Sequence, residues 1–170
     1  MTASASSTAD ASPCRSRSVT EPPPVFAIAA QPDGKVLLGG SFVAFNGTTR
    51  PNLIRLTSSG AVDTTFNTGV GLNGPVYAIA LQPDGKVVVG GDFTTFDPGP
   101  GGTTVGHIAR LNSDGSLDNT FNPGTGASSD IKTIVLQSDG KIVIGGFFTS
   151  YDGTGRNYIA RLNSNGSLDN

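Results

Sequence analysis

The clearest hydrophobic pattern lies in the middle of the chain. Residues 76–82 (VYAIALQ) are apolar almost throughout, and residues 86–93 (KVVVGGDF) form a second, β-branched run. Between them stands Pro83-Asp84-Gly85, in which proline presets the first turn angle and glycine supplies a positive φ. Two apolar runs joined in this way predict a β-hairpin. Because the first run has no polar face, we expect it to lie buried near the centre of the molecule.

Two further strands are expected after this hairpin. Residues 108–111 (IARL) form a short strand that is apolar except for Arg110, and Ser113-Asp114-Gly115-Ser116 predicts a second tight turn before an outer strand over 117–121. The glycine pair Gly90-Gly91 inside the second strand is typical of a bulge or a close backbone approach. This part of the chain therefore predicts a four-stranded antiparallel meander.

The same phrase is written three times, as AQPDGKVLLGGSF (30–42), LQPDGKVVVGGDF (81–93) and LQSDGKIVIGGFF (136–148). The middle copy carries four extra residues, which we place in a loop insertion within 97–107. A period near 50 residues is typical of propeller blades. We therefore divide the chain into blade 1 (25–75), blade 2 (76–130) and a truncated blade 3 (131–170).

The sequence motif of the repeat resembles that of a known family. Asp-Gly-Lys, aliphatic residues, Gly-Gly-x-Phe and then Ile-Ala-Arg-Leu-Asn-x-Asp-Gly-Ser-Leu-Asp-x-Thr-Phe resemble the Delta-60 repeat family of β-propeller blades, best over 76–122 and more loosely over 25–170. The resemblance implies a module of large secreted or surface proteins, and it implies no particular activity. Copy three stops at Leu168-Asp169-Asn170, before the Thr-Phe pair.

The fold expected is therefore an all-β propeller segment of three four-stranded antiparallel blades, the last one incomplete. Complete rings need about four to eight blades, so we expect an open arc rather than a closed ring. Each terminal blade should expose one apolar face. Further blades, or self-association of two chains into a six-bladed ring, could cover these faces.

Residues 1–24 differ from the rest, being rich in Ser, Ala and Pro without a hydrophobic period. Such a segment buries too little apolar surface to offset its ordering entropy, so we expect a disordered tail. The single cysteine, Cys14, allows no intrachain disulfide, and no apolar stretch of signal-peptide type precedes it. Localisation thus stays open from the residues alone, with an extracellular or surface position favoured only by the resemblance.

Composition narrows the possible partners. The net charge of −2 and the absence of a Lys/Arg cluster argue against nucleic acid. No apolar run approaches the roughly 20 residues of a membrane-spanning helix, so no membrane span is expected. The 24 glycines suit short strands and turns better than helices.

The residues offer little for catalysis or metal binding. Asn112-Ser113-Asp114-Gly115 resembles part of an EF-hand calcium loop. When Gly115 is aligned with the glycine of that loop, Arg110 and Phe121 fall at the first and last ligand positions, so the segment lacks the oxygen ligands of an EF-hand. His107 is the only histidine, and we expect it at the surface. Glu21 is the only glutamate, so paired glutamates are absent. We expect no catalytic residue, no cofactor site and no metal site.

Two charged positions recur in every copy. An arginine in the third strand is followed eight residues later by an aspartate, giving the pairs Arg55/Asp63, Arg110/Asp118 and Arg161/Asp169. A single substrate would rarely use all three pairs equivalently. We therefore favour an ion pair that latches the third strand to the outer strand over a substrate clamp.

Loop variation suggests where a ligand could bind. The Asp-Gly turns keep their length, whereas the loops at 46–52, 97–107 and 152–157 and those between copies (67–75, 122–130) vary. In an up-down blade both variable sets emerge on one face, and variable loops on a rigid scaffold commonly form binding surfaces. Unconstrained loops are the equal alternative.

The function expected is a non-catalytic scaffold or recognition module of a larger protein, with a protein or glycan ligand on the variable-loop face. The alternative is a propeller-type enzyme, a lyase or glycosidase, whose site forms only in the complete ring.

Overall fold

The computed structural model describes residues 24–97 and 99–170, and these residues form β-strands, turns and loops without a helix. Nearly all of the tail expected at 1–24, with Cys14 and Glu21, lies outside the described residues. The strands are β1 (Val25–Ala30), β2 (Val36–Gly40), β3 (Ala44–Phe45), β4 (Thr48–Thr49), β5 (Leu53–Leu56), β6 (Val76–Leu81), β7 (Val87–Gly91), β8 (Thr95–Phe96), β9 (Thr103–Thr104), β10 (Ile108–Leu111), β11 (Ile131–Leu136), β12 (Ile142–Gly146), β13 (Ser150–Tyr151), β14 (Thr154–Gly155) and β15 (Ile159–Leu162).

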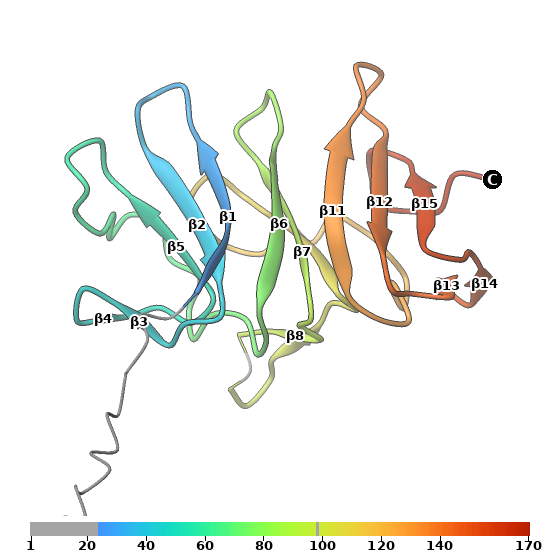
Figure 1. The fold of residues 1–170 in the computed structure, drawn as a ribbon, viewed down its shortest axis with the longest axis horizontal. Coiled ribbons are helices and arrows are strands. Elements are labelled where there is room, and N and C mark those ends of the chain that lie inside the picture. The colour runs from blue at the N-terminus through green and yellow to red at the C-terminus, as the bar shows by residue number, and fades with distance from the viewer. Residues whose placement is uncertain (1–23, 98) are drawn as a thin grey trace, which may run out of the picture.

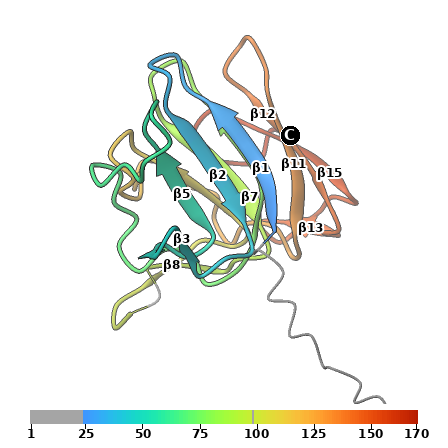
Figure 2. The ribbon, with the colours of Figure 1, turned by 60° about the vertical axis from the view of Figure 1, so that its left-hand side comes forward.

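Three antiparallel sheets carry the fold, one in each copy of the repeat. Their strand orders are β1-β2-β5, β6-β7-β10 and β11-β12-β15. Strand β6 contacts both β1 and β11, so the first strands lie side by side and the sheets fan out from them (Figure 1). Figure 2 shows the first sheet from its outer side. None of the sheets formed by the described residues closes on itself, which confirms the open segment of β-propeller blades.

The tight turns follow the prediction. Gly34, Gly85 and Gly140 have φ values of 82°, 84° and 83°. In the middle copy Asp84 accepts a hydrogen bond at Oδ1 from the Lys86 N–H at 3.1 Å. The conformation of these glycines is the one that β-branched residues tolerate poorly, which explains why the same turn sequence recurs.

The glycine pairs serve both of the roles expected of them. Opposite Gly90-Gly91 the register between β6 and β7 shifts between Val76 and Ala78, which is a bulge. A Cβ atom added to Gly90 would lie 2.7 Å from Cγ2 of Ile131 in the next sheet. The glycine therefore lets one blade's second strand approach the first strand of the following blade.

Two apolar clusters fill the spaces between blades. Leu37 and Leu53 of blade 1 pack with Val87 and Val89 of blade 2. In the same way Val88 and Ile108 of blade 2 pack against side chains of blade 3. Neither sheet could bury these side chains alone, so the repeat is stabilised by stacking.

The expected burial of the first strands is wrong at the two ends of the arc. Ile28 of β1 is 70% exposed and Val135 of β11 is 57% exposed, whereas Val76 of β6 is fully buried. The reason is that no blade precedes blade 1 or follows blade 3 among the described residues. The exposed apolar face expected on blade 3 is present, with Ile159 62% exposed. On blade 1, however, Leu38, Phe42 and Ile54 form a small buried cluster of their own.

The fourth strand predicted at 117–121 is reduced to a single bridged pair, Leu111 with Leu117. Asp118 then captures the backbone N–H of Thr120 at Oδ1, 3.0 Å away, and the Phe121 N–H bonds the Asp118 carbonyl. Aspartate side chains that bond the backbone two residues on favour turns over strands. Each main sheet is therefore three-stranded, with a bridged edge.

Small hairpins replace the loops expected after the second strand. Strand β3 pairs with β4, β8 with β9 and β13 with β14. Residues 97–102 separate β8 from β9, against only two residues in each of the other hairpins, so the extra residues of the middle copy lie at a hairpin tip. No helix able to cross a membrane occurs among residues 24–97 and 99–170.

Candidate functional site

The repeated charges meet as predicted. The Nε atom of Arg110 donates to Oδ2 of Asp118 at 2.7 Å, and Arg55 makes the same bond to Asp63 at 2.8 Å. Both pairs are buried, and Arg161 is also paired with Asp169. The prediction of an ion pair between the third strand and the segment after it is confirmed.

Sequence analysis missed a third member of this group. Lys86, which follows the tight turn, donates from Nζ to the same Asp118 oxygen at 2.8 Å. Thr120 fills the other carboxylate oxygen through its hydroxyl and its N–H. Lys35 and Lys141 take the same place beside Asp63 and Asp169. The signal was present in the sequence, because a lysine follows every first Asp-Gly pair.

The arginines also reach across the boundary between blades. Arg55 donates from Nη1 to the Ser113 carbonyl at 2.7 Å, and Arg110 donates to the Ser164 carbonyl at 2.6 Å. Each acceptor lies in the second tight turn of the following blade. We name the groups clamp 1 (Lys35, Arg55, Asp63, Thr65), clamp 2 (Lys86, Arg110, Asp118, Thr120) and clamp 3 (Lys141, Arg161, Asp169).

A phenylalanine completes the first two clamps. The Arg55 guanidinium lies 4.6 Å from the ring centre of Phe66, and that of Arg110 lies 4.9 Å from Phe121. Such stacking favours arginine over lysine at this position. The aromatic residues of the Thr-Phe pairs therefore cover the charged group that joins neighbouring blades.

The clamp carboxylates are held in the ionised form. Hydrogen bonds from Thr65, opposed by burial and assisted by Lys35, hold the pKa of Asp63 well below its usual range. At Asp118 burial raises the pKa, but the bonds from Lys86 and Thr120 outweigh it and the net shift is downward. Lys141 and Arg161 lower the pKa of Asp169. These groups are consequently poor candidates for a general acid at neutral pH.

The variable loops gather on one face, as expected. In Figure 1 the small hairpins lie at the lower end of the arc, opposite the Asp-Gly turns. Leu72 bridges Phe96, and Ala127 bridges Tyr151. Each loop between copies thus rests on the hairpin of the blade that follows it. We call this surface, made by 67–75, 122–130 and the three hairpins, the variable-loop face.

Side chains fix these loops in place. Asn73 accepts at Oδ1 from the N–H groups of Thr94 and Thr95 at 2.8 and 2.9 Å, and Asp97 accepts from the Val70 N–H at 2.9 Å. In the next copy Ser128 replaces Asn73 in the same role. These hydrogen bonds make the face a fixed platform. Two apolar side chains are nevertheless exposed there, Val43 at 73% and Val70 at 56%.

Backbone strain on this face repeats with the copies. Asn46, Asp97 and Asp152 share one positive-φ position of the hairpins, and Asn52, His107 and Tyr158 share another just before the third main strand. Repetition in every copy argues for a structural cause. Tyr158 is the exception, because tyrosine lacks the short polar side chain that favours this conformation in Asn and His.

The expectation that His107 is a surface residue is wrong. Its side chain is only 13% exposed, and Nδ1 lies 3.2 Å from the Gly91 carbonyl. The ring is therefore used to hold the end of β7. Asp114 is likewise occupied, since it accepts hydrogen bonds at Oδ1 from the N–H and hydroxyl groups of Ser116.

One pocket adjoins the variable-loop face. It has a volume of about 230 Å³ and lies between the inserted hairpin and the link from blade 2 to blade 3. Thr103 and Thr104 line one side, and Asn122 and Pro123 line the other. Two larger pockets lie on the opposite face, between neighbouring Asp-Gly turns. Within the described ranges no three His, Cys, Asp or Glu residues are grouped as metal ligands.

Comparison with known protein families identifies the three copies of the repeat. No curated protein matches the sequence. A family model described as a domain of unknown function (DUF5122) beta-propeller matches residues 31–66, 82–121 and 137–170, which is more than half of the chain. These segments contain the tight turns and the arginine and aspartate of all three clamps. The chain therefore belongs to this DUF5122 beta-propeller family.

Proposed function

We propose that the chain is a non-catalytic scaffold or recognition module that binds a protein or glycan ligand on its variable-loop face. The observation that carries the proposal is the contrast between the two faces. The turns of one face are uniform in length, whereas the other face combines loops of different length and sequence on a fixed platform. Such loops on a rigid scaffold are a common basis for recognition.

The pocket beside the inserted hairpin gives this surface a particular site. Both sets of variable loops contribute to its walls, and the rest of the lining comes from β10 and the segment after it, with Arg110 and Asp118 of clamp 2 among them. The threonine and asparagine side chains there offer donors and acceptors. Its volume is below the roughly 300 Å³ typical of enclosed ligand sites. It suits one residue of a longer ligand, such as a terminal sugar or a single side chain.

A glycan array with the full chain tests the proposal. The test variant replaces residues 97–102 with Asp-Gly, the turn that blade 3 uses at this position. Ser138→Ala, in a turn of the opposite face, is the matched control. We expect oligosaccharide binding that the shortened hairpin abolishes and the control retains. Binding that survives the shortened hairpin and is lost in the control would contradict the assignment of the face.

The protein arm of the proposal uses the same variants. Immobilised wild-type chain would retain a protein that the shortened hairpin does not retain. If no glycan binds and the two variants retain the same proteins, the recognition role is refuted.

The alternative function is a propeller-type lyase or glycosidase whose site forms only in a complete ring. The clamp aspartates are its obvious acids, but they are engaged by lysine, arginine and threonine. Release of unsaturated or reducing sugar from the bound oligosaccharides would favour this alternative over a scaffold.

Two finer points belong to the proposal. Within the family, we propose that the copies are of the Delta-60 type, a proposal supported by the resemblance of the motif Ile-Ala-Arg-Leu-Asn-x-Asp-Gly-Ser-Leu-Asp-x-Thr-Phe. That resemblance, together with a ligand-binding loop face, favours a place in a larger secreted or surface protein, completed by further blades or by self-association.

A further inference from the structure

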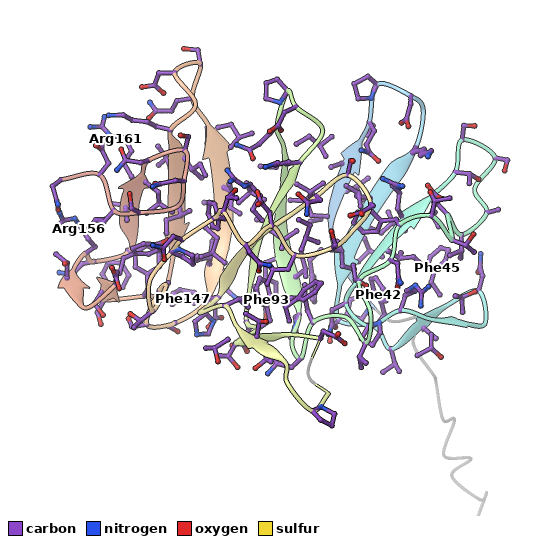
Figure 3. All side chains as sticks on the ribbon, turned by 180° about the vertical axis from the view of Figure 1, so that it is seen from behind. Phe42, Phe45, Phe93, Phe147, Arg156 and Arg161 are labelled. Carbon is purple, nitrogen blue, oxygen red and sulfur yellow. The ribbon has the colours of Figure 1, made fainter. Side chains whose placement is uncertain are left out.

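The outer face of blade 3 repeats residues that are buried in the other blades. Ile159 is 62% exposed, whereas Ile108, at the same position of blade 2, is fully buried against blade 3. The Arg161 side chain is 52% exposed, against 9% for Arg110. In Figure 3 Arg161 lies at the C-terminal end of the arc. This face therefore resembles the interfaces between blades, and none of the described residues forms a blade on it.

Clamp 3 is incomplete on the same face. In clamps 1 and 2 the arginine Nη1 atom donates to the carbonyl of a serine in the following blade. Arg161 makes only the Nε bond to Asp169 among the described residues. Its side chain is 52% exposed, and the described residues offer it no counterpart of the Ser113 and Ser164 carbonyls.

A glycine gap lies next to this clamp. Gly39 and Gly90 each receive two apolar side chains from the first strand of the next blade, Val76 with Ile79 and Ile131 with Ile134. At Gly145, the third glycine of the series, an added Cβ would meet only Thr133 and Tyr158 of its own blade. The space that a following first strand would fill is open.

Blade 1 carries the complementary groups on its opposite side. Val25 and Ile28 are the counterparts of Val76 and Ile79, and they are 40% and 70% exposed. The carbonyls of Ser113 and Ser164 accept the arginine hydrogen bonds of clamps 1 and 2. Their counterpart in blade 1 is Ser58, which is exposed in the second turn of that blade. Nothing lies within 4 Å of a Cβ added to Gly60, whereas at Gly115 the previous blade's Asn67 would be 2.8 Å away.

We propose that two copies of this chain associate head to tail, with the outer face of blade 3 of one copy docking on the outer side of blade 1 of the other. Arg161 donates to the Ser58 carbonyl of the second copy, and Val25 and Ile28 of that copy fill the space at Gly145. The contact reproduces the two interfaces that already exist within the chain.

The same contact made twice joins two chains of three blades into a ring of six, which is within the usual size range of propellers. The contact is heterologous, because different surfaces of the two copies meet, and such contacts end in closed rings when the rotation allows it. Leu38 and Ile54 of blade 1 are already buried, so the contact depends mainly on the inner strand and the second turn.

Sedimentation velocity of the full chain over a range of concentrations tests the proposal. We expect a dimer. Arg161→Ala removes a charge-assisted hydrogen bond and should weaken the dimer by about tenfold or more. Arg156→Ala is the matched control, because Arg156 is a partly exposed arginine of the same blade whose side chain bonds, among the described residues, Gly155 and Asn170. The control should dimerise like the wild type.

Mixing two variant chains shows whether a variant fails to dimerise because it lost a contact or because it misfolded. Ile28→Lys should also weaken the dimer, because it alters the opposite partner surface. A mixture of Arg161→Ala and Ile28→Lys chains retains one intact pair of surfaces, so we expect it to form dimers at concentrations at which each variant alone stays monomeric. A monomer at every concentration, a ladder of larger species, or a mixture without recovery would each overturn the head-to-tail ring.

Discussion

Clamp 2 and clamp 3 contain the same lysine, arginine and aspartate, yet only the first is buried. Asp118 and Arg110 are 5% and 8% exposed, while the Arg161 side chain is 52% exposed. Two groups make the difference in clamp 2: the Ser164 carbonyl of the next blade accepts from Arg110, and the ring of Phe121, in blade 2 itself, covers the guanidinium. The burial of a repeated charge is thus decided by the neighbouring blade, and identical residues are expected to differ in their contribution to stability.

The largest effect expected from this comparison is at the two arginines. Arg110→Ala leaves the Asp118 carboxylate without one of its cations and the Ser164 carbonyl without its donor, and should lower the free energy of unfolding by about 3 kcal/mol. Arg161→Ala, measured at concentrations that favour the monomer, should cost less than about 1 kcal/mol. Urea denaturation of both variants provides the measurement. Equal losses would show that burial by the next blade does not matter.

A second contrast lies at the glycines that face the next blade. Gly90→Ala places a Cβ 2.7 Å from Ile131 across the blade boundary, and should destabilise the chain by about 2 kcal/mol through overpacking. Gly145→Ala meets the exposed side chain of Thr133 instead and should cost clearly less. Thermal denaturation compares the two. A larger loss at Gly145 would be incompatible with the open face of blade 3.

The smallest effect concerns the residue before the third main strand. Tyr158 has a φ of 66°, a conformation that Asn52 and His107 adopt in the other blades. Tyr158→Asn should therefore raise the free energy of unfolding by about 0.5 kcal/mol, because asparagine tolerates this region better. Asn52→Tyr, the reverse change in blade 1, should lower it. A stabilising Asn52→Tyr would show that the strain has been misassigned.

The features that sequence analysis predicted are those that depend on short separations along the chain. The turn at Gly85, the strand at 108–111 and the pair formed by Arg110 and Asp118 all involve residues within about one hairpin of each other. The Asn46-Gly47 and Asp152-Gly153 hairpins carried a similar signal. They were read as loops because their flanking strands are only two residues long.

The features that were missed depend on distant or backbone groups. The acceptor of Arg55 is a carbonyl 58 residues away, and every residue has a carbonyl, so no side-chain pattern marks it. The outer strand was expected from its apolar residues, but the Asp118 side chain bonds the Thr120 N–H and ends the ladder after one bridge. His107 was expected at the surface because it lies in a glycine-rich stretch, and the structure instead uses it to hold β7.

The order in which the clamp groups occur along the chain affects how the protein folds during translation. Each arginine is made before the carbonyl that it binds, by 58 residues for Arg55 and 54 for Arg110. A blade emerging from the ribosome therefore holds its charged group in water until the second turn of the next blade follows. Because domains form from the N-terminus as the chain is made, each new blade secures the one before it. Translation that stalls between residues 56 and 113 leaves a first blade with its arginine exposed, and this is the interval in which we expect a chaperone or a protease to recognise the nascent chain.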